Sequence, residues 1–200
     1  MKTLRNPISR RISIYAFTAV ALFFFMTGCG SVYKNPLIDI TIQPTEPGNI
    51  RANSLGIFNF NYLDEGDNSQ LSFAFAEILQ AELLKHHFIR VAATTKRSFR
   101  DVDQAIEIGR QLGYDLILVG TIDKYYEGMR SSDSEVSITL KIIETQSSTT
   151  LWYLTGQMAA KYHPGSDYIL FHTDAKPATS PSVLGQSVLK RMAKELCSFR

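Results

Sequence analysis

The sequence predicts a mixed α/β fold, in which helices pack on one mixed β-sheet with the element order β-α-β-α-β-β-β-α. In the first half, a strand-like apolar run is followed twice by apolar residues at helical spacing. In the second half, long strand-like runs follow one another with only short polar turns between them. The first pattern implies right-handed crossovers between parallel strands, and the second implies an antiparallel meander.

The first strand-helix-strand unit begins where the sequence becomes strongly apolar. Residues 55–63, "LGIFNFNYL", are rich in large apolar and aromatic side chains and predict a strand. Apolar residues then recur at helical spacing from Leu71, which predicts a helix that ends at about His87. Residues 88–93, "FIRVAA", follow as a short second strand.

A second helix and a second crossover come next. Asp101 is the predicted N-cap, with Gln104 three residues on, and Gly113 is the predicted C-terminal stop. Residues 114–128, "YDLILVGTIDKYYEG", begin as a nearly continuous apolar run and end with alternating residues. This change predicts a strand that is buried at its start and extends beyond its cover.

The last third contains two further strands and a final helix. Residues 135–145, "EVSITLKIIET", and 149–162, "TTLWYLTGQMAAKY", predict a pair of strands around a short turn. Residues 163–180 predict a loop rich in His, Gly, Asp and Pro. The last helix is predicted to open at Pro181, because proline is favoured at the first helical position.

The N-terminus has the composition of a bacterial secretory signal. Its basic head carries no acidic residue, and an apolar block of about 15 residues follows, shorter than the ~20 that a membrane-spanning helix usually needs. The block ends in "MTGC", residues 26–29, which resembles the lipobox of bacterial lipoproteins. That resemblance implies cleavage between Gly28 and Cys29 and a diacylglycerol on the Cys29 thiol. The alternative is an uncleaved anchor helix with an incidental cysteine.

The lipobox also bears on the destination of the protein and on its domains. Gly30, rather than Asp, follows the cysteine, and by resemblance to enteric lipoproteins this implies the periplasmic face of the outer membrane. We therefore expect a signal peptide over 1–28, a lipidated tether over 29–54 and a single domain over 55–200. The tether contains one short alternating piece, residues 38–42, which we expect to form an edge strand.

The composition of the mature chain excludes few classes of protein. Removing residues 1–28 leaves 172 residues, enough for one domain of ordinary size. Four of the 21 basic residues lie in the signal, so the rest carries 17 against 19 acidic residues, and no basic field suggests nucleic acid. Cys197 would be the only thiol without a lipid, so no intramolecular disulfide is possible. It is expected to be a buried helix residue or, alternatively, to form a disulfide dimer.

The middle of the chain carries a motif that resembles a family of small periplasmic lipoproteins. Residues 113–120 match its "G-x-D-x-(apolar)-(apolar)-x-G" pattern through Gly113, Asp115 and Gly120, and Leu151-Trp152 matches the end of its hairpin pattern. This group is related to the curli secretion protein CsgG and includes PelC, LpoB and FlgO. The build of the chain is nearest to PelC.

The resemblance covers roughly residues 55–160 and the last helix. The family's usual turn glycine is missing here, since Ser148 and Thr149 occupy that region, and another turn type is expected. The matching positions are structural glycines and core residues. They therefore imply the fold much more than a function.

No constellation of residues predicts catalysis, a metal or a cofactor. P-loop, G-x-G-x-x-G and G-x-S-x-G motifs do not occur. The His and carboxylate groups that we considered as metal ligands lack a fixed spacing, and a solvated face or loop is the expected alternative. These groups are His86 and His87; His163 and His172 with Asp167 and Asp174; Asp64, Glu65 and Asp67; and the helical pair Asp103 and Glu107.

Aromatic residues on the late strands suggest an interface. Tyr125, Tyr126, Trp152 and Tyr153 lie on the strands predicted over 114–128 and 149–162. Tyr and Trp are favoured at protein interfaces, although packing in the core is the competing explanation. Alternation places Trp152 on one face of its strand and Tyr153 on the other, so one face could need a partner to cover it.

Two functions of different classes follow from the resemblance. The first is a non-enzymatic structural subunit of an envelope export or assembly system, for example in exopolysaccharide secretion, in which the protein binds the membrane through Cys29, associates with itself and contacts envelope proteins. The second is an LpoB-like activator of a peptidoglycan synthase. The short tether favours the first.

Overall fold

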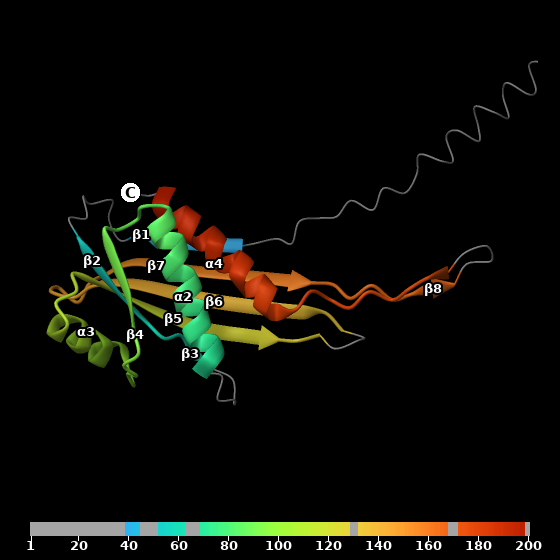
Figure 1. Cartoon of the computed structure of the whole chain (residues 1–200), viewed down its shortest axis with the longest axis horizontal. Helices are drawn as coiled ribbons and strands as arrows, with labels where there is room; N and C mark the ends of the chain where they lie inside the picture. Colours follow the sequence, from blue (N-terminus) through green and yellow to red (C-terminus); the bar gives the residue numbers. More distant parts are fainter. Residues whose placement is uncertain (1–38, 45–51, 63–68, 129–131, 168–171, 199–200) are drawn as a thin grey trace, which may run out of the picture. The chain divides into compact units, whose positions relative to one another are not determined.

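The computed structural model describes residues 39–44, 52–62, 69–128, 132–167 and 172–198. They all fall in one compact unit, Pro36–Arg200. Figure 1 shows its strands and helices. The strands are β1 (Asp39–Pro44), β2 (Ser54–Phe58), β3 (Asn61–Tyr62), β4 (Val91–Thr95), β5 (Leu116–Tyr126), β6 (Ser134–Glu144), β7 (Thr150–Ala160), β8 (Ser166–Asp167) and β9 (His172–Thr173), and the helices are α2 (Ser69–Lys85), α3 (Val102–Gln111) and α4 (Pro181–Ser198).

The predicted mixed α/β fold and its order of elements are confirmed from β2 to α4. One mixed sheet has the strand order β1-β7-β6-β5-β2-β4, and β3 extends it beside β5. The strands β2, β4 and β5 are parallel, as the two crossovers require, and β5, β6 and β7 form the antiparallel meander. The expected edge strand in the tether is also present, as β1, which pairs antiparallel with β7.

Two segments differ from the prediction. The run over 55–63 is interrupted, because β2 ends at Phe58 and pairing with β5 resumes only at Asn61. Between them the ring of Phe60 packs over Gly120 of β5, where a Cβ atom would clash with the ring. Residues 163–180, predicted as a loop, contain the short hairpin β8–β9. Their backbone groups pair although the sequence there shows no alternation of polar and apolar residues.

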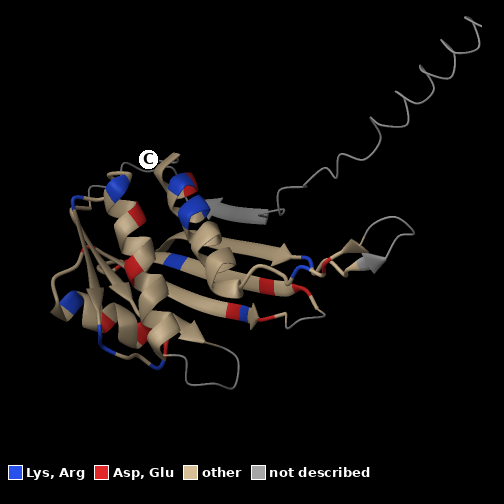
Figure 2. Ribbon diagram, turned by 45° about the vertical axis from the view of Figure 1, so that its right-hand side comes forward, with Lys and Arg blue, Asp and Glu red and all other residues tan. Residues whose placement is uncertain are grey.

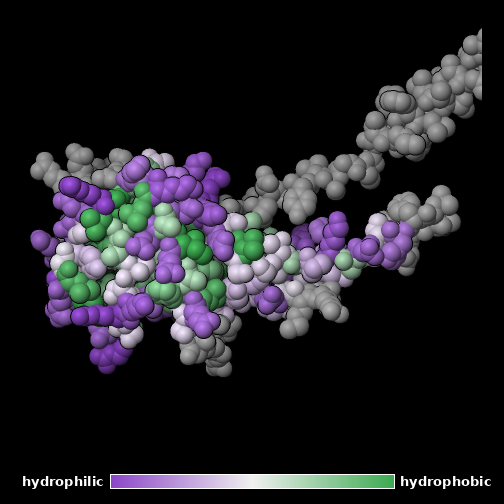
Figure 3. Space-filling view, in the orientation of Figure 1, coloured by the Kyte–Doolittle hydropathy of each residue, from purple (hydrophilic) through white to green (hydrophobic). Residues whose placement is uncertain are grey.

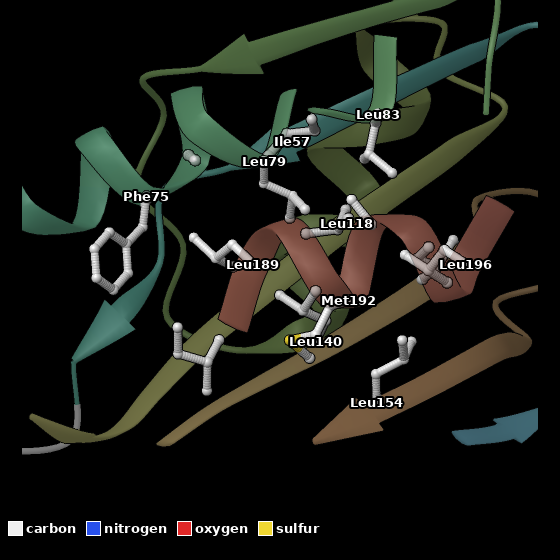
Figure 4. Packing of buried hydrophobic residues seen from close by; sticks show 14 of the residues in the cluster. Ile57, Phe75, Leu79, Leu83, Leu118, Leu140, Leu154, Leu189, Met192 and Leu196 are labelled. Carbon is white, nitrogen blue, oxygen red and sulfur yellow. The ribbon is translucent and has the colours of Figure 1, made fainter. Parts of the chain in front are cut away.

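Helices cover the two faces of the sheet unequally. The helices α2 and α4 lie side by side on one face, and their apolar residues form the main core with β2, β5, β6 and β7 (Figures 1 and 4). The helix α3 covers the other face only where β2, β5 and the end of β6 meet, around Phe58, Ile117 and Ile143. The rest of that face, over β5, β6 and β7, has no helix of the described part of the chain on it.

The helix α2 ends in a left-handed cap formed by a histidine. His87 has φ of 54°, its N–H bonds to the carbonyl of Leu84 at 3.0 Å, and the N–H of Phe88 bonds to the carbonyl of Leu83 at 3.0 Å. These two bonds form a Schellman motif, which is usually completed by a contact between the apolar residues that Leu83 and Phe88 provide here. The helix thus stops where the sequence predicted.

The helix α3 begins and ends at the predicted residues. The carboxylate of Asp101 accepts a hydrogen bond from the N–H of Gln104 at 2.8 Å, as an N-cap does. At the other end, Gly113 has φ of 73°, and the N–H of Tyr114 bonds to the carbonyl of Gly109 at 3.0 Å. The same motif therefore ends both helices, but only α3 has a glycine at the left-handed position.

The carboxylate of Asp115 ties two parallel strands together where they begin. Its Oδ2 accepts hydrogen bonds from the N–H of Asn53 at 2.8 Å, the N–H of Ser54 at 3.0 Å and the hydroxyl of Ser54 at 3.0 Å. The Ser54 hydroxyl in turn accepts from the N–H of Asp115 at 3.0 Å. The hydrogen bond from Asn53 is the largest influence on this carboxyl, and the pKa of Asp115 is lowered from its ordinary value.

The turn between β6 and β7 is fastened to α3. Arg110 donates from Nε to the carbonyl of Thr145 at 2.6 Å and from Nη2 to the hydroxyl of Ser148 at 2.8 Å. Ser148 has φ of 59°, a backbone conformation that glycine adopts without strain. The missing turn glycine of the family pattern is therefore replaced by a serine whose side chain gains a bond to Arg110.

The two helix caps generate a paired prediction. We expect His87→Gly to raise the free energy of unfolding by up to about 1 kcal/mol, because the left-handed conformation is strained for a residue with a Cβ atom. We expect Gly113→Ala to lower the free energy of unfolding by about 1 kcal/mol for the same reason. Urea unfolding of the two variants beside the wild type checks both signs, and equal midpoints for all three proteins would contradict the assignment.

The Asp115 clamp predicts a pH dependence. Because the folded pKa is lowered, the clamp contributes stability that is present above the unfolded pKa and is lost as the pH falls through the folded pKa. We expect Asp115→Asn to lower the free energy of unfolding by about 1 to 2 kcal/mol at neutral pH. Urea unfolding at pH 7 and near pH 3 should show the gap between the two proteins narrowing in acid; a gap that widens in acid would refute the role.

Candidate interaction surface

The histidines that we considered as metal ligands lie in two places, at the end of α2 and in the segment that carries β8 and β9. His86 and His87 end α2, and His86 lies 3.7 Å from Glu82 of the same helix. His163 pairs through its backbone with Lys176. In the described part of the chain, no three His, Cys, Asp or Glu residues are grouped so that they could hold a metal ion.

The other residues that we considered as metal ligands are exposed wherever the structure describes their side chains. His172 lies on exposed β9, with Nε2 at 3.2 Å from Asp174. Asp103 and Glu107 are exposed on α3, so their predicted place on its solvent side is confirmed. Asp64, Glu65 and Asp67 lie outside the described residues.

Two of the four aromatic residues expected at an interface belong to the covered face of the sheet. Trp152 is only 5% exposed, and its ring packs edge-on against Phe88 with centroids 5.8 Å apart. Tyr125 packs against Phe75 and Tyr62, and burial raises the pKa of its phenol. Trp152 is thus a core residue, whereas Tyr125 is half-buried on the same covered face.

The other two aromatic residues lie on the opposite face, which we call the open face. Tyr126 stands opposite Glu135 of β6 and is 52% exposed, and Tyr153 stands opposite Lys141 and is half-buried. The open face is formed by the residues of β5, β6 and β7 that point away from α2 and α4. They are Thr121, Asp123, Lys124, Tyr126, Glu135, Ser137, Thr139, Lys141, Tyr153, Thr155 and Gln157.

Polar contacts organise the open face. Thr139 donates to the carboxylate of Asp123 at 2.6 Å, and Lys124 bonds to Glu135 at 2.6 Å. A bulge in β5 between Ile122 and Lys124 brings both charged side chains of β5 to this face. The ammonium of Lys141 lies 5.7 Å from the ring centroid of Tyr153, within the range of a cation–π contact. This surface can form many hydrogen bonds but has no arranged nucleophile and base.

Sequence reasoning did not separate the two faces fully. It placed Trp152 and Tyr153 on opposite sides of β7, which is correct. It did not foresee that α3 stops short of β6 and β7. The signal was present in the alternation of Ser137, Thr139 and Lys141 along β6, since a strand covered on both faces would be apolar throughout.

The residues of the predicted lipid site, Gly28 and Cys29, lie outside the described residues. Cys197 is a half-buried thiol on α4 that packs against the main core. Within the part of the chain that the structure describes, none of the helices combines the length and the apolar character of a membrane span. Figure 2 shows basic and acidic residues intermixed on the side in view.

Comparison with known proteins places the fold. No protein-family model matches the sequence, and no curated protein matches it either. Among solved structures, the chain is similar to a PelC dodecamer from Paraburkholderia phytofirmans, with a TM-score of 0.55 and 14% sequence identity over 80% of this chain and 97% of that chain. The C-terminal domain of LpoB from Salmonella enterica gives a TM-score of 0.41 and 15% identity over 56% of this chain and 86% of that chain.

A lipoprotein from Neisseria meningitidis is also similar, with a TM-score of 0.42 and 13% identity over 71% of this chain and 99% of that chain. The likeness to the PelC structure confirms the predicted resemblance at the level of the fold.

Proposed function

We propose that the protein is a lipid-anchored, self-associating structural subunit of an envelope export or assembly system, held on the periplasmic side of the outer membrane. The lipobox-like residues 26–29 support the lipid anchor, and Gly30 after the cysteine supports the outer membrane as the location. Lipid chains stabilise membrane attachment by about 0.8 kcal/mol per buried methylene, so two or three chains suffice for a stable anchor.

The observation that carries this proposal is the short distance between the anchor and the sheet. Asp39, where β1 begins, follows Cys29 by ten residues, which span at most about 35 Å when fully extended. The sheet would therefore remain close to the bilayer that holds the lipid. That arrangement suits a subunit of a membrane-bound assembly better than an activator that must reach across the periplasm.

The fold supports self-association. The PelC structure with the same fold is a dodecamer. Anchoring by lipid confines the subunits to two dimensions, which raises their effective concentration and favours weak contacts between them. An LpoB-like activator remains the alternative, and genes for export or for cell-wall synthesis beside the gene of this protein would distinguish the two.

The proposed anchor can be tested by lipid labelling. We expect metabolic labelling with a palmitate analogue to label the wild type and to fail for Cys29→Ala, because the Cys29 thiol receives the lipid. Cys197→Ala is the matched control and should label as the wild type does. Equal labelling of Cys29→Ala would remove the proposed anchor.

The proposed self-association can be tested by the mass of the particle in solution. We expect light scattering of the detergent-purified lipidated protein to show a multimer, because lipid anchoring and the PelC-like fold both favour self-association. The same measurement on protein without its signal and cysteine separates the contribution of the lipid. A strict monomer in both forms, at tens of micromolar, would favour the activator function instead.

A further inference from the structure

The strand β4 forms one of the two edges of the mixed sheet. The strand order places β4 at one end of the sheet and β1 at the other, so each has one neighbour. Among the described residues, β4 pairs with β2 alone, in parallel, and it lies beside α2 (Figure 1). A free edge presents unpaired backbone groups, which can accept another strand.

The hydrogen-bond pattern identifies which groups of β4 point outward. The N–H of Val91 bonds to the carbonyl of Asn53 at 3.1 Å. In a parallel ladder with this register, alternate residues direct both backbone groups to the neighbour, so Val91, Ala93 and Thr95 face β2. The N–H and carbonyl groups of Ala92 and Thr94 therefore point away from the sheet.

The outward groups of β4 are only partly capped. The side chain of Gln80 on α2 donates to the carbonyl of Ala92 at 2.8 Å, which confirms the outward direction of that group. Within the described part of the chain, no hydrogen bond uses the outward N–H and carbonyl of Thr94. Thr94 is half-buried, and a second strand could satisfy both of these groups.

The surroundings of this edge suit a second strand. Val91 is 51% exposed at the start of β4, and Leu84, one turn after Gln80 on α2, is 38% exposed. Figure 3 shows apolar side chains reaching the surface among polar ones on the side that carries α2 and α4. Natural edges are commonly protected by proline or by charged residues, and the five residues of β4, "VAATT", include neither.

We propose that the free edge of β4 binds β1 of a second copy of this chain, so that the sheet continues from one copy to the next. This inference rests on the proposed self-association. The strand β1 is the other edge of the same sheet, and it runs opposite to β4, because β5, β6, β7 and β1 alternate in direction while β4 is parallel to β5. The new pair is therefore antiparallel, the commoner kind of strand pairing.

The two edges differ, so the contact is head-to-tail. Such contacts generate rings when the rotation between subunits closes, and every edge of the sheet is then paired. A symmetric pairing of two β4 edges would form a dimer and would leave both β1 edges open. This difference makes pairing of β1 with β4 the arrangement that explains an assembly larger than a dimer.

A proline at Thr94 tests the edge directly. Proline lacks the outward N–H that the partner strand would use, and it spares the bonds of β4 to β2, which use Val91, Ala93 and Thr95. We expect the lipidated Thr94→Pro protein to be mostly monomeric at a concentration where the wild type is a multimer. Thr94→Ala is the matched control, because it keeps the N–H, and it should assemble as the wild type does.

The outcomes separate this inference from the proposed function. Circular dichroism and the thermal midpoint should show that Thr94→Pro is folded. A folded Thr94→Pro protein that still forms the wild-type multimer would overturn the β4 contact and leave self-association intact. A wild type that is monomeric in detergent would overturn both.

A crosslink identifies the partner strand and does not depend on the folding of a proline variant. Leu84 flanks the β4 edge, so the photoreactive residue p-benzoylphenylalanine placed there should crosslink to a peptide of a second copy that contains residues 39–44. Mass spectrometry of the digested, crosslinked multimer identifies the peptide to which residue 84 is joined. Crosslinks only to the peptide of β4 would overturn the head-to-tail contact in favour of a symmetric dimer.

Discussion

The apolar layer between the sheet and the helix pair α2 and α4 holds the long strands in place. Leu118 of β5, Leu140 of β6 and Leu154 of β7 are fully buried in this layer (Figure 4). The two helices can approach closely because Gly185 of α4 lies against the ring of Phe75, where a Cβ atom would clash. This layer also fixes which side of each long strand α2 and α4 cover.

A second set of contacts lies where the parallel strands begin, and it gives physical roles to the family-like motif. Gly113 permits the left-handed end of α3, Asp115 ties β5 to β2, and Gly120 leaves space for Phe60. Arg110 then links α3 to the β6–β7 turn. These residues stabilise the fold through structural contacts, and for this reason the motif predicted a fold and no activity.

The surfaces that remain for function are those that the helices leave free. The open face of β5, β6 and β7 is polar and internally hydrogen-bonded, so it can stay in contact with water at little cost. The edges at β1 and β4 are different, since their backbone groups can be satisfied by another strand. A short connection to a lipid and two complementary edges would together place many copies of one sheet side by side near a membrane.

The sequence by itself determined the class of fold, the order of elements and the ends of the helices, because periodicity, caps and turn residues are local signals. Asp101, His87 and Gly113 all act within a few residues of their own position. Only the tertiary structure decided that Trp152 is a core residue while Tyr153 is not, since both lie on one strand and burial depends on which face the distant helix α4 covers. It also decided that β4 is the edge opposite the expected edge strand β1, because strand order is set by contacts between residues far apart in the chain, and these leave no periodic trace in the sequence.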